Sequence, residues 1–363
     1  MDLAPPAFHE TSNLRRKACA AGLDPAHWYA VEWESAVPKG KVVEVRFQGA
    51  SLALYRGQDG ELHALENRCA HRQVKLSHGF VEGCQLKCVY HGWTYDGDGR
   101  LASIPHELFG RSFPAVRLRS FPVRVRHGLI WVFFGDPALA AEREIPDVPE
   151  LADERSWAHV PIDFLWRAHP TLIVNNVMDS THVATLHGRR FRTRSFRYGP
   201  VTHCEAERER VLVSHKIEVD PGGLVGYVAK NIAVDTQTAC FEYPYLWVSV
   251  GGVYKLWNFL LPIDERTTRV FMLSCAERVR IPFTPWLSPA WLARALLPLA
   301  RRILVRPLFD EDGLSTAYEQ EGYEAHFDRP SLDLHPAPRL CYQLTIRKWE
   351  EHLAASERAQ RAG

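Results

Sequence analysis

Cys69-Ala70-His71 and Cys88-Val89-Tyr90-His91 are separated by 16 residues, and the second segment runs on into Gly92-Trp93. Each segment therefore carries one cysteine and one histidine. Zinc motifs usually pair like with like, with two cysteines in one short segment and two histidines in the other. The chain offers two thiolates and two imidazoles in a different, mixed arrangement.

This mixed set is typical of a Rieske [2Fe–2S] centre, in which two cysteines hold one iron and two histidines hold the other. Turn-forming residues at 79–83 and 96–99 flank the second segment and fit such a loop. Neutral imidazoles in place of thiolates raise the reduction potential by several hundred millivolts over an all-cysteine cluster. We therefore expect a centre that accepts electrons and passes them on, with a structural zinc site as the alternative.

Length and composition narrow the possibilities further. The chain has 363 residues, which favours two domains, each with its own core. Its 44 basic and 43 acidic residues nearly cancel, so no charge excess points to nucleic acid. The eight cysteines form no disulfide-like framework, and the N-terminus has no signal-peptide pattern. We expect a cytoplasmic protein that binds no nucleic acid.

Local patterning predicts an α+β chain with two domains. Residues 1–27 are a lead-in, 28–135 a small all-β domain, 136–155 a linker rich in proline and charge, and 156–363 a larger second domain. Strands are predicted at 41–47, 51–55, 62–65, 128–134, 211–219, 224–229, 239–243, 254–261 and 269–276. Helices are predicted at 171–186, 289–325 and 342–360.

One stretch, residues 286–309, is apolar enough to raise the question of a membrane. It contains four arginines and three prolines, and charges near the centre of a membrane span are costly. We therefore expect no transmembrane span. A half-buried helix, a cover over an apolar cavity and a patch that rests on a membrane surface remain open.

A second group of candidate ligands lies in the predicted helix at 171–186 and just after it. Asp179 and His182 are three residues apart and would share a helix face. His187 is rotated by roughly 140° from His182 on a regular helix, so both bind one metal only if the helix ends or bends there. Gly188 is a suitable stop. Two histidines and a distant carboxylate would form the facial triad of a non-haem Fe(II) oxygenase.

With both motifs, C-x-H-x₁₆-C-x₂-H and N-x₂-D-x₂-H-x₄-H, the chain resembles the α subunit of a Rieske non-haem iron oxygenase from Trp28 to the last helix. Val89 replaces a frequent proline of that family, at a position that is not a ligand. The resemblance implies a Rieske domain joined to a helix-grip (START-like) catalytic domain with an antiparallel sheet. The implied ligands are Cys69, His71, Cys88 and His91 for the cluster, and His182 and His187 for the mononuclear Fe(II).

The third iron ligand is expected in Phe309-Asp310-Glu311-Asp312-Gly313. The resemblance favours Asp312, with Asp310 as the alternative on another helix face. Acids at the start of a helix would also be stabilised by the helix dipole without binding metal.

Asn176 and Asp179 of the second motif are assigned to the catalytic group. Asp179 is expected to accept a hydrogen bond from the free ring N–H of His182, because metal-bound imidazoles are commonly fixed in this way. In the family the corresponding aspartate also pairs with a cluster histidine of the next subunit, here His91. The resemblance therefore implies a closed homotrimer.

Both metal sites together predict a terminal oxygenase. The chain has no G-x-G-x-x-G fingerprint after a strand, so NAD(P)H is expected to be oxidised by a separate reductase, with or without a ferredoxin. The leading hypothesis is monooxygenation of an apolar aromatic or alicyclic substrate with O₂. The alternatives are an electron-transfer protein without oxygenase activity, or demethylation, N-oxygenation or desaturation with the same metals. Aromatic residues between 243 and 259 are candidates for a pocket wall, although plain core is the commoner role for such residues.

Overall fold

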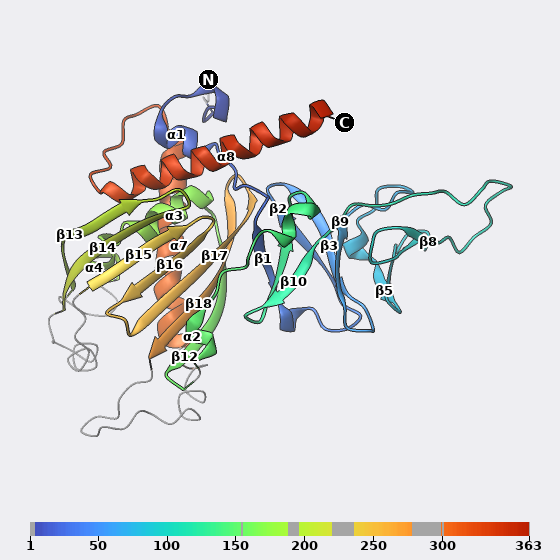
Figure 1. The fold of residues 1–363 in the computed structure, drawn as a ribbon, viewed down its shortest axis with the longest axis horizontal. Coiled ribbons are helices and arrows are strands. Elements are labelled where there is room, and N and C mark those ends of the chain that lie inside the picture. The colour runs from blue at the N-terminus through green and yellow to red at the C-terminus, as the bar shows by residue number, and fades with distance from the viewer. Residues whose placement is uncertain are drawn as a thin grey trace. The chain divides into compact units, whose positions relative to one another are not determined.

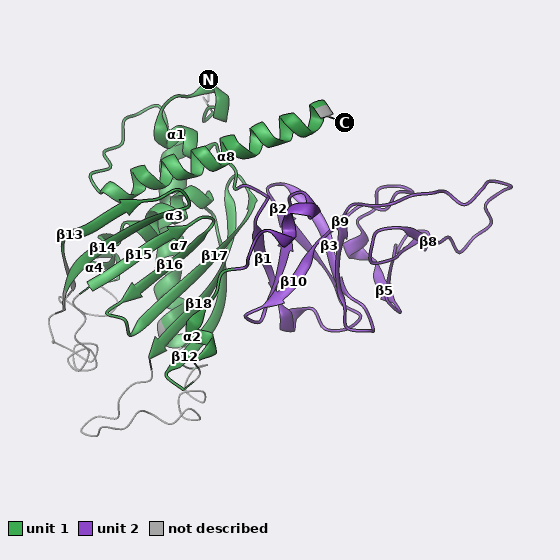
Figure 2. Cartoon of the chain, in the orientation of Figure 1, with its two compact units in different colours: residues 1–23, 146–363 green, residues 24–145 purple. Residues whose placement is uncertain are grey.

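The computed structural model describes residues 4–153, 155–187, 196–219, 236–277, 299 and 301–362. These residues form two compact units, drawn in different colours in Figure 2. The smaller unit comprises residues 24–145, and the larger one comprises residues 1–23 and 146–363. The domain boundaries expected from the sequence remain predictions.

The smaller unit is built from antiparallel strands, in agreement with the all-β prediction (Figure 1). One sheet has the order β1-β11-β10, with β1 at Trp28–Trp33, β10 at Val123–Arg126 and β11 at Leu129–Phe133. A second has the order β2-β3-β4-β9, with β2 at Val42–Phe47, β3 at Ala50–Arg56, β4 at Leu62–Glu66 and β9 at Ser120–Phe121. All five residues of β11 are buried, in agreement with its continuous apolar run, and the strand pairs with β1 on one side and β10 on the other.

A third sheet of short strands in this unit flanks the second Cys/His segment. Its order is β5-β6-β7-β8, with β5 at Phe80–Glu82, β6 at Gln85–Lys87, β7 at Thr94–Tyr95 and β8 at Leu101–Ser103. Short 3₁₀ turns at Glu34–Ala36 (η2), Leu76–His78 (η3) and Pro137–Ala141 (η4) connect the strands. The first Cys/His segment follows β4, and the second lies between β6 and β7.

The larger unit contains a seven-stranded antiparallel sheet of order β12-β18-β17-β16-β15-β14-β13. Its strands are β12 at Trp157–Trp166, β13 at Phe196–Ala206, β14 at Arg210–Val219, β15 at Thr236–Glu242, β16 at Tyr245–Val250, β17 at Tyr254–Asp264 and β18 at Thr267–Glu277. The sequence patterns missed β12, β13 and β16. The strand predicted at 224–229 lies outside the described residues.

The larger unit also contains helices that pack against this sheet. In the view of Figure 1, α7 crosses behind it. The helical elements are η1 at Phe8–Glu10, α1 at Leu14–Cys19, α2 at Pro149–Ala152, α3 at Pro170–Met178, α4 at His182–Leu186, the π-helical turn η5 at Arg301–Val305, α7 at Arg306–His326 and α8 at Pro336–Ala362. Together they form the helix-covered sheet that the resemblance implied.

The helix predicted at 171–186 is divided into α3 and α4, so the prediction of one helix was wrong. His169 caps α3 by accepting a hydrogen bond from the Thr171 backbone N–H at 3.2 Å, and Pro170 occupies the first turn. At the other end the Asp179 carboxylate accepts hydrogen bonds from the Thr181 N–H and hydroxyl at 3.1 and 2.6 Å. Such local bonds compete with helical ones and end α3 at Met178.

The later helices differ from prediction mainly in their limits. The described part of the predicted 289–325 helix is continuous from Arg301, and α8 is longer at both ends than the predicted 342–360. Most of the apolar stretch 286–309 lies outside the described residues. No helix in the described part of the chain is long and apolar enough to cross a membrane.

Candidate metal centres and substrate cavity

The two Cys/His segments fold back on themselves at the edge of a hydrophobic core. The Cys69 N–H donates to the Val74 carbonyl at 2.9 Å, and the Cys88 N–H donates to the Trp93 carbonyl at 2.8 Å. Both thiols are almost fully buried in this core, with Cys69 1% and Cys88 2% exposed. The pKa of Cys88 is raised, first by burial and then by the neighbouring Cys69.

The two histidines of these segments also lie together. The rings of His71 and His91 have centroids 4.5 Å apart, and His71 stacks on Trp93 at 4.9 Å. His71 Nδ1 and Trp93 Nε1 are buried and make no hydrogen bond within the described chain. Two buried thiols that metal would deprotonate, beside two adjacent imidazoles, fit the donor chemistry of a Rieske cluster.

Tyr95 is a further member of this group that the sequence patterns did not single out. Its hydroxyl lies 3.3 Å from Cys69 Sγ and accepts a hydrogen bond from the Ala70 N–H at 3.0 Å. The register of β6 and β7, which pairs Leu86 with Tyr95, holds it there. A tyrosine seven residues after the second cysteine was the available signal.

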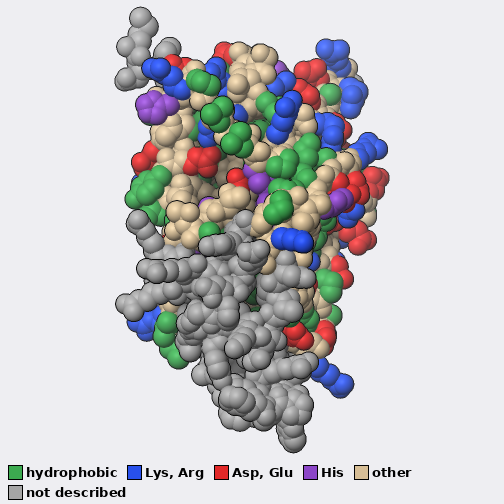
Figure 3. Space-filling model, turned by 90° about the vertical axis from the view of Figure 1, so that its left-hand side faces the viewer, with side chains coloured by type: hydrophobic (Ala, Val, Ile, Leu, Met, Phe, Trp, Pro, Cys, Tyr) green, Lys and Arg blue, Asp and Glu red, His purple; other side chains and the backbone are tan. Residues whose placement is uncertain are grey.

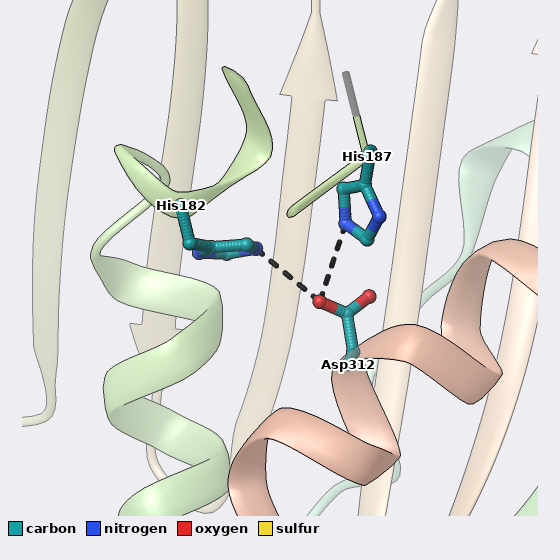
Figure 4. A group of neighbouring side chains, drawn as sticks. All are labelled: His182, His187 and Asp312. Carbon is teal, nitrogen blue, oxygen red and sulfur yellow. Dashed lines mark ion pairs between the residues drawn. The ribbon is translucent and has the colours of Figure 1, made fainter. Parts of the chain in front are cut away.

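In the larger unit, His182, His187 and Asp312 converge from α4, the residue after α4, and α7 (Figure 4). One ligand atom from each lies within 4.8 Å of the other two. The Nε2 atoms of both histidines lie 3.3 Å from Oδ1 of Asp312. His187 directly follows α4, which ends at Leu186, and its N–H still bonds the Val183 carbonyl at 3.2 Å. Its ring centroid lies 5.6 Å from that of His182. Gly188, the expected stop, lies outside the described residues.

The Nδ1 atom of each histidine is held by an acceptor. His182 Nδ1 lies 2.8 Å from the backbone carbonyl of Asp179, and His187 Nδ1 lies 2.9 Å from Oε2 of Glu311. A carbonyl or carboxylate only accepts, so Nδ1 carries the hydrogen and Nε2 keeps a lone pair for metal. His182 thus bonds Asp179 as predicted, but the acceptor is the main-chain carbonyl and not the side-chain carboxylate. The Asp179 carbonyl is free to accept this bond because α3 ends at Met178, and the Asp179 carboxylate is engaged with Thr181.

The electrostatics of this group also suit a cation. Burial alone would raise the pKa of Asp312, but the imidazoles of His182 and His187 hold it below its usual range. Burial opposes protonation of His187, yet Asp312 and Glu311 raise its pKa. Asn176 reaches the same carboxylate, with Nδ2 3.5 Å from Oδ1 of Asp312. Two imidazoles and one buried carboxylate fit the facial triad of a non-haem iron site.

The alternative ligand, Asp310, is exposed, whereas Asp312 is 5% exposed. Immediately after Asp312, α7 packs tightly on β12. A Cβ atom at Gly313 would lie 2.5 Å from Nε1 of Trp166, so only glycine fits here without displacing the indole.

Beside the triad is a cavity of about 240 Å³ with a mainly apolar wall. Alternate residues of β16 and β17 line it, with Val248 and Val250 on the first strand and Leu256 and Asn258 on the second. Of the aromatic residues considered as a pocket wall, Tyr254 is a lining residue. Trp257 and Phe259 alternate with Asn258 and so face the other side of the sheet.

The outer surface of this part of the molecule is mixed in charge. On the face drawn in Figure 3, acidic and basic side chains are interspersed, with histidines visible between hydrophobic side chains next to the residues drawn in grey. The visible surface therefore presents both signs of charge to a ligand.

Two family models match the chain. One describes a Rieske [2Fe-2S] domain and matches residues 27–120, and the other describes the vanillate O-demethylase oxygenase C-terminal domain and matches residues 166–354. Together they cover the Cys/His segments and the residues of the triad.

Similar proteins are oxygenase components. The chain is 38% identical over 349 residues to a 4beta-methylsterol monooxygenase of Methylococcus capsulatus, covering 95% of this chain and 94% of that protein. It is 39% identical to the oxygenase component of a chloroacetanilide N-alkylformylase of Rhizorhabdus wittichii, over 44% of this chain and 45% of that one. The crystal structure of dicamba monooxygenase bound to dicamba has the same fold, with a TM-score of 0.68 and 23% identity over 94% of this chain and 100% of that one. These findings do not support the alternative of an electron carrier without oxygenase activity.

Proposed function

Because this chain belongs to the Rieske non-haem iron oxygenase α subunits, we propose that its substrate is an apolar alicyclic molecule of the methylsterol kind. The chain is a terminal oxygenase component with one Rieske [2Fe–2S] cluster and one mononuclear iron, and it receives electrons from a separate reductase. The similarity to the methylsterol monooxygenase along 95% of this chain carries the substrate proposal.

We assign the ligands of both metal centres from the sequence motifs and from the geometry of the side chains. Cys69, His71, Cys88 and His91 would hold the cluster, and His182, His187 and Asp312 the iron. Bound there, the cluster would supply electrons one at a time and the iron would supply a site for O₂. The exposure of Asp310 favours Asp312 as the carboxylate.

The protein's own part is to fix the ligands and to orient the substrate. The Asp179 carbonyl and the Glu311 carboxylate hold the Nδ1 hydrogens, so that both Nε2 lone pairs point to the metal position. Asn176 holds the Asp312 carboxylate from the side of α3. The apolar wall formed by Val248, Leu256 and neighbouring residues would exclude water and hold a ring skeleton by contact.

We also propose a closed homotrimer in the cytoplasm, in which Asp179 of one chain pairs with His91 of the next. The support is the resemblance in the motif N-x₂-D-x₂-H. A closed ring lets each chain give and receive one such contact. Subunit mixing tests it: rings assembled from His91→Ala and Asp179→Ala chains should regain activity, because some interfaces then contain both intact residues.

The test of the substrate proposal is turnover of a 4-methylsterol by the holoenzyme with a reductase, NADH and ¹⁸O₂. We expect a product that has gained one labelled oxygen atom. Formaldehyde released from an O-methyl or N-methyl aromatic would instead identify a demethylase. Loss of two hydrogens without oxygen would identify a desaturase, and hydroxylation of an aromatic ring in place of the sterol would overturn the alicyclic assignment.

A further inference from the structure

One polar side chain interrupts the apolar wall of the cavity. Asn258 lies on β17, opposite Leu246 of β16 and Met272 of β18. It lines the cavity together with Met272 and Leu256, and it is 0% exposed to solvent. A leucine of nearly the same shape would extend the apolar wall at this point. The presence of an amide here requires a physical reason.

The amide of Asn258 has no partner within the described part of the protein. Neither its Nδ2 nor its Oδ1 makes a hydrogen bond there, although both atoms are buried. Burying an amide without a partner costs free energy, and most buried polar groups are paired. This unpaired state distinguishes Asn258 from a structural asparagine.

Apart from Trp166, the other polar side chains of the wall have partners. Gln237 bonds the Ser180 hydroxyl, and the Tyr254 hydroxyl lies 3.0 Å from that of Ser274. Trp166 Nε1 is also unpaired, but it faces the backbone of α7 at Gly313. Asn258 is thus the lining residue of the described chain whose donor and acceptor are both left for a molecule in the cavity.

We propose that the Asn258 amide binds a hydroxyl group carried by an apolar ring skeleton. An amide offers both donors and an acceptor, and a hydroxyl both donates and accepts, so the two groups satisfy each other reciprocally. A ketone or an ether would leave Oδ1 unpaired because each only accepts. No lysine or arginine is among the described residues that line the cavity, so no permanently cationic side chain is available there to pair with a carboxylate. This assignment rests on the proposed function, since a methylsterol is an apolar skeleton with one hydroxyl.

The test compares two ligands on the wild-type holoenzyme: a 4-methylsterol and its analogue that lacks the ring hydroxyl. The deoxy analogue leaves a buried amide unpaired, so we expect it to bind about 5- to 150-fold more weakly. Asn258→Leu should remove that preference, because the variant has nothing to pair with the hydroxyl. The matched control, Met272→Leu, changes an apolar neighbour on the same wall and should shift the binding of both ligands alike.

A second measurement needs no ligand. Asn258→Leu should raise the thermal unfolding midpoint of the ligand-free holoenzyme, because it replaces an unpaired buried amide by an apolar group of the same shape. A lower midpoint with wild-type preference intact would mean that the amide has a structural partner, and would overturn the proposal. If the variant does not fold, the comparison of the two ligands on the wild-type protein still decides.

The outcomes separate this inference from the proposed function. Turnover of the methylsterol with equal binding of its deoxy analogue would overturn the role of Asn258 and leave the proposed function standing. Binding that depends on Asn258 and on the hydroxyl, without any oxidised product, would support the anchor and overturn methylsterol oxidation.

Discussion

Tyr95→Phe should lower the reduction potential of the Rieske cluster. The Ala70 N–H donates to the phenolic oxygen, so the phenol's own hydrogen is left for Cys69 Sγ at 3.3 Å. Burial, and then the neighbouring Cys69, raise the pKa of Tyr95, so the phenol stays protonated. A thiolate bound to iron accepts this hydrogen bond. The reduced cluster carries one more negative charge than the oxidised one and gains more from the donor.

The size of the shift follows from the value of one hydrogen bond. Taking the difference between the two redox states as about 1 kcal/mol, and 59 mV per tenfold change for one electron, the potential should fall by about 40 mV. A redox titration followed by the EPR signal of the reduced cluster measures it.

The control for this prediction is Tyr55→Phe. Tyr55 is buried in the same core, and its hydroxyl lies 3.4 Å from the carbonyl of Cys84, which is not in either Cys/His segment. Its loss should leave the potential unchanged. An unchanged potential in Tyr95→Phe, or an equal shift in both variants, would refute the reasoning.

Three further predictions concern the iron site. Asp312→Asn should lower the iron content from three to two per chain, because it removes the charged ligand while the cluster stays, whereas Asp310→Asn should keep three; the opposite pattern would reverse the assignment. Glu311→Gln should weaken iron binding by about 10- to 100-fold in a chelator competition, because His187 Nδ1 loses a charged acceptor, and unchanged retention of iron would show that the contact is dispensable. Asp179→Asn should keep both metals, since His182 bonds its carbonyl, yet slow reoxidation of a reduced cluster by substrate and O₂ in a single turnover; a normal rate would exclude the cross-subunit role.

Motif spacing selected two histidine pairs whose rings the structure brings together, because metal chemistry restricts residue types at short separations. It could not predict the partners that depend on tertiary placement. Glu311 meets His187 across 124 positions of sequence, and only the packing of α7 beside α4 brings them together. The bond from His182 to the Asp179 carbonyl depends on where α3 ends, which periodicity alone does not fix. The sequence Asp179-Ser180-Thr181 was the local sign of that end.

Two of the three strands missed in the larger unit share a physical feature. β12 contains Pro161 and β13 contains Pro200, and a proline interrupts the pattern expected of a strand. Both strands lie at the edges of the seven-stranded sheet, where a missing N–H costs no ladder bond. In contrast β11, which pairs with β1 and β10, was predicted from its uninterrupted apolar run.

Because Gly313 has no side chain, α7 can pack closely on Trp166, and this packing sets the position of the neighbouring Asp312 carboxylate. The helix that bears Asp312 rests on the indole, and a single methyl group at position 313 would hold the two apart. Gly313→Ala would then change the reach of the carboxylate while its chemistry stays the same. A substitution at position 313 would thus move the Asp312 carboxylate without changing its chemistry. Substitution of Asp312 itself changes both the position and the chemistry of the donor.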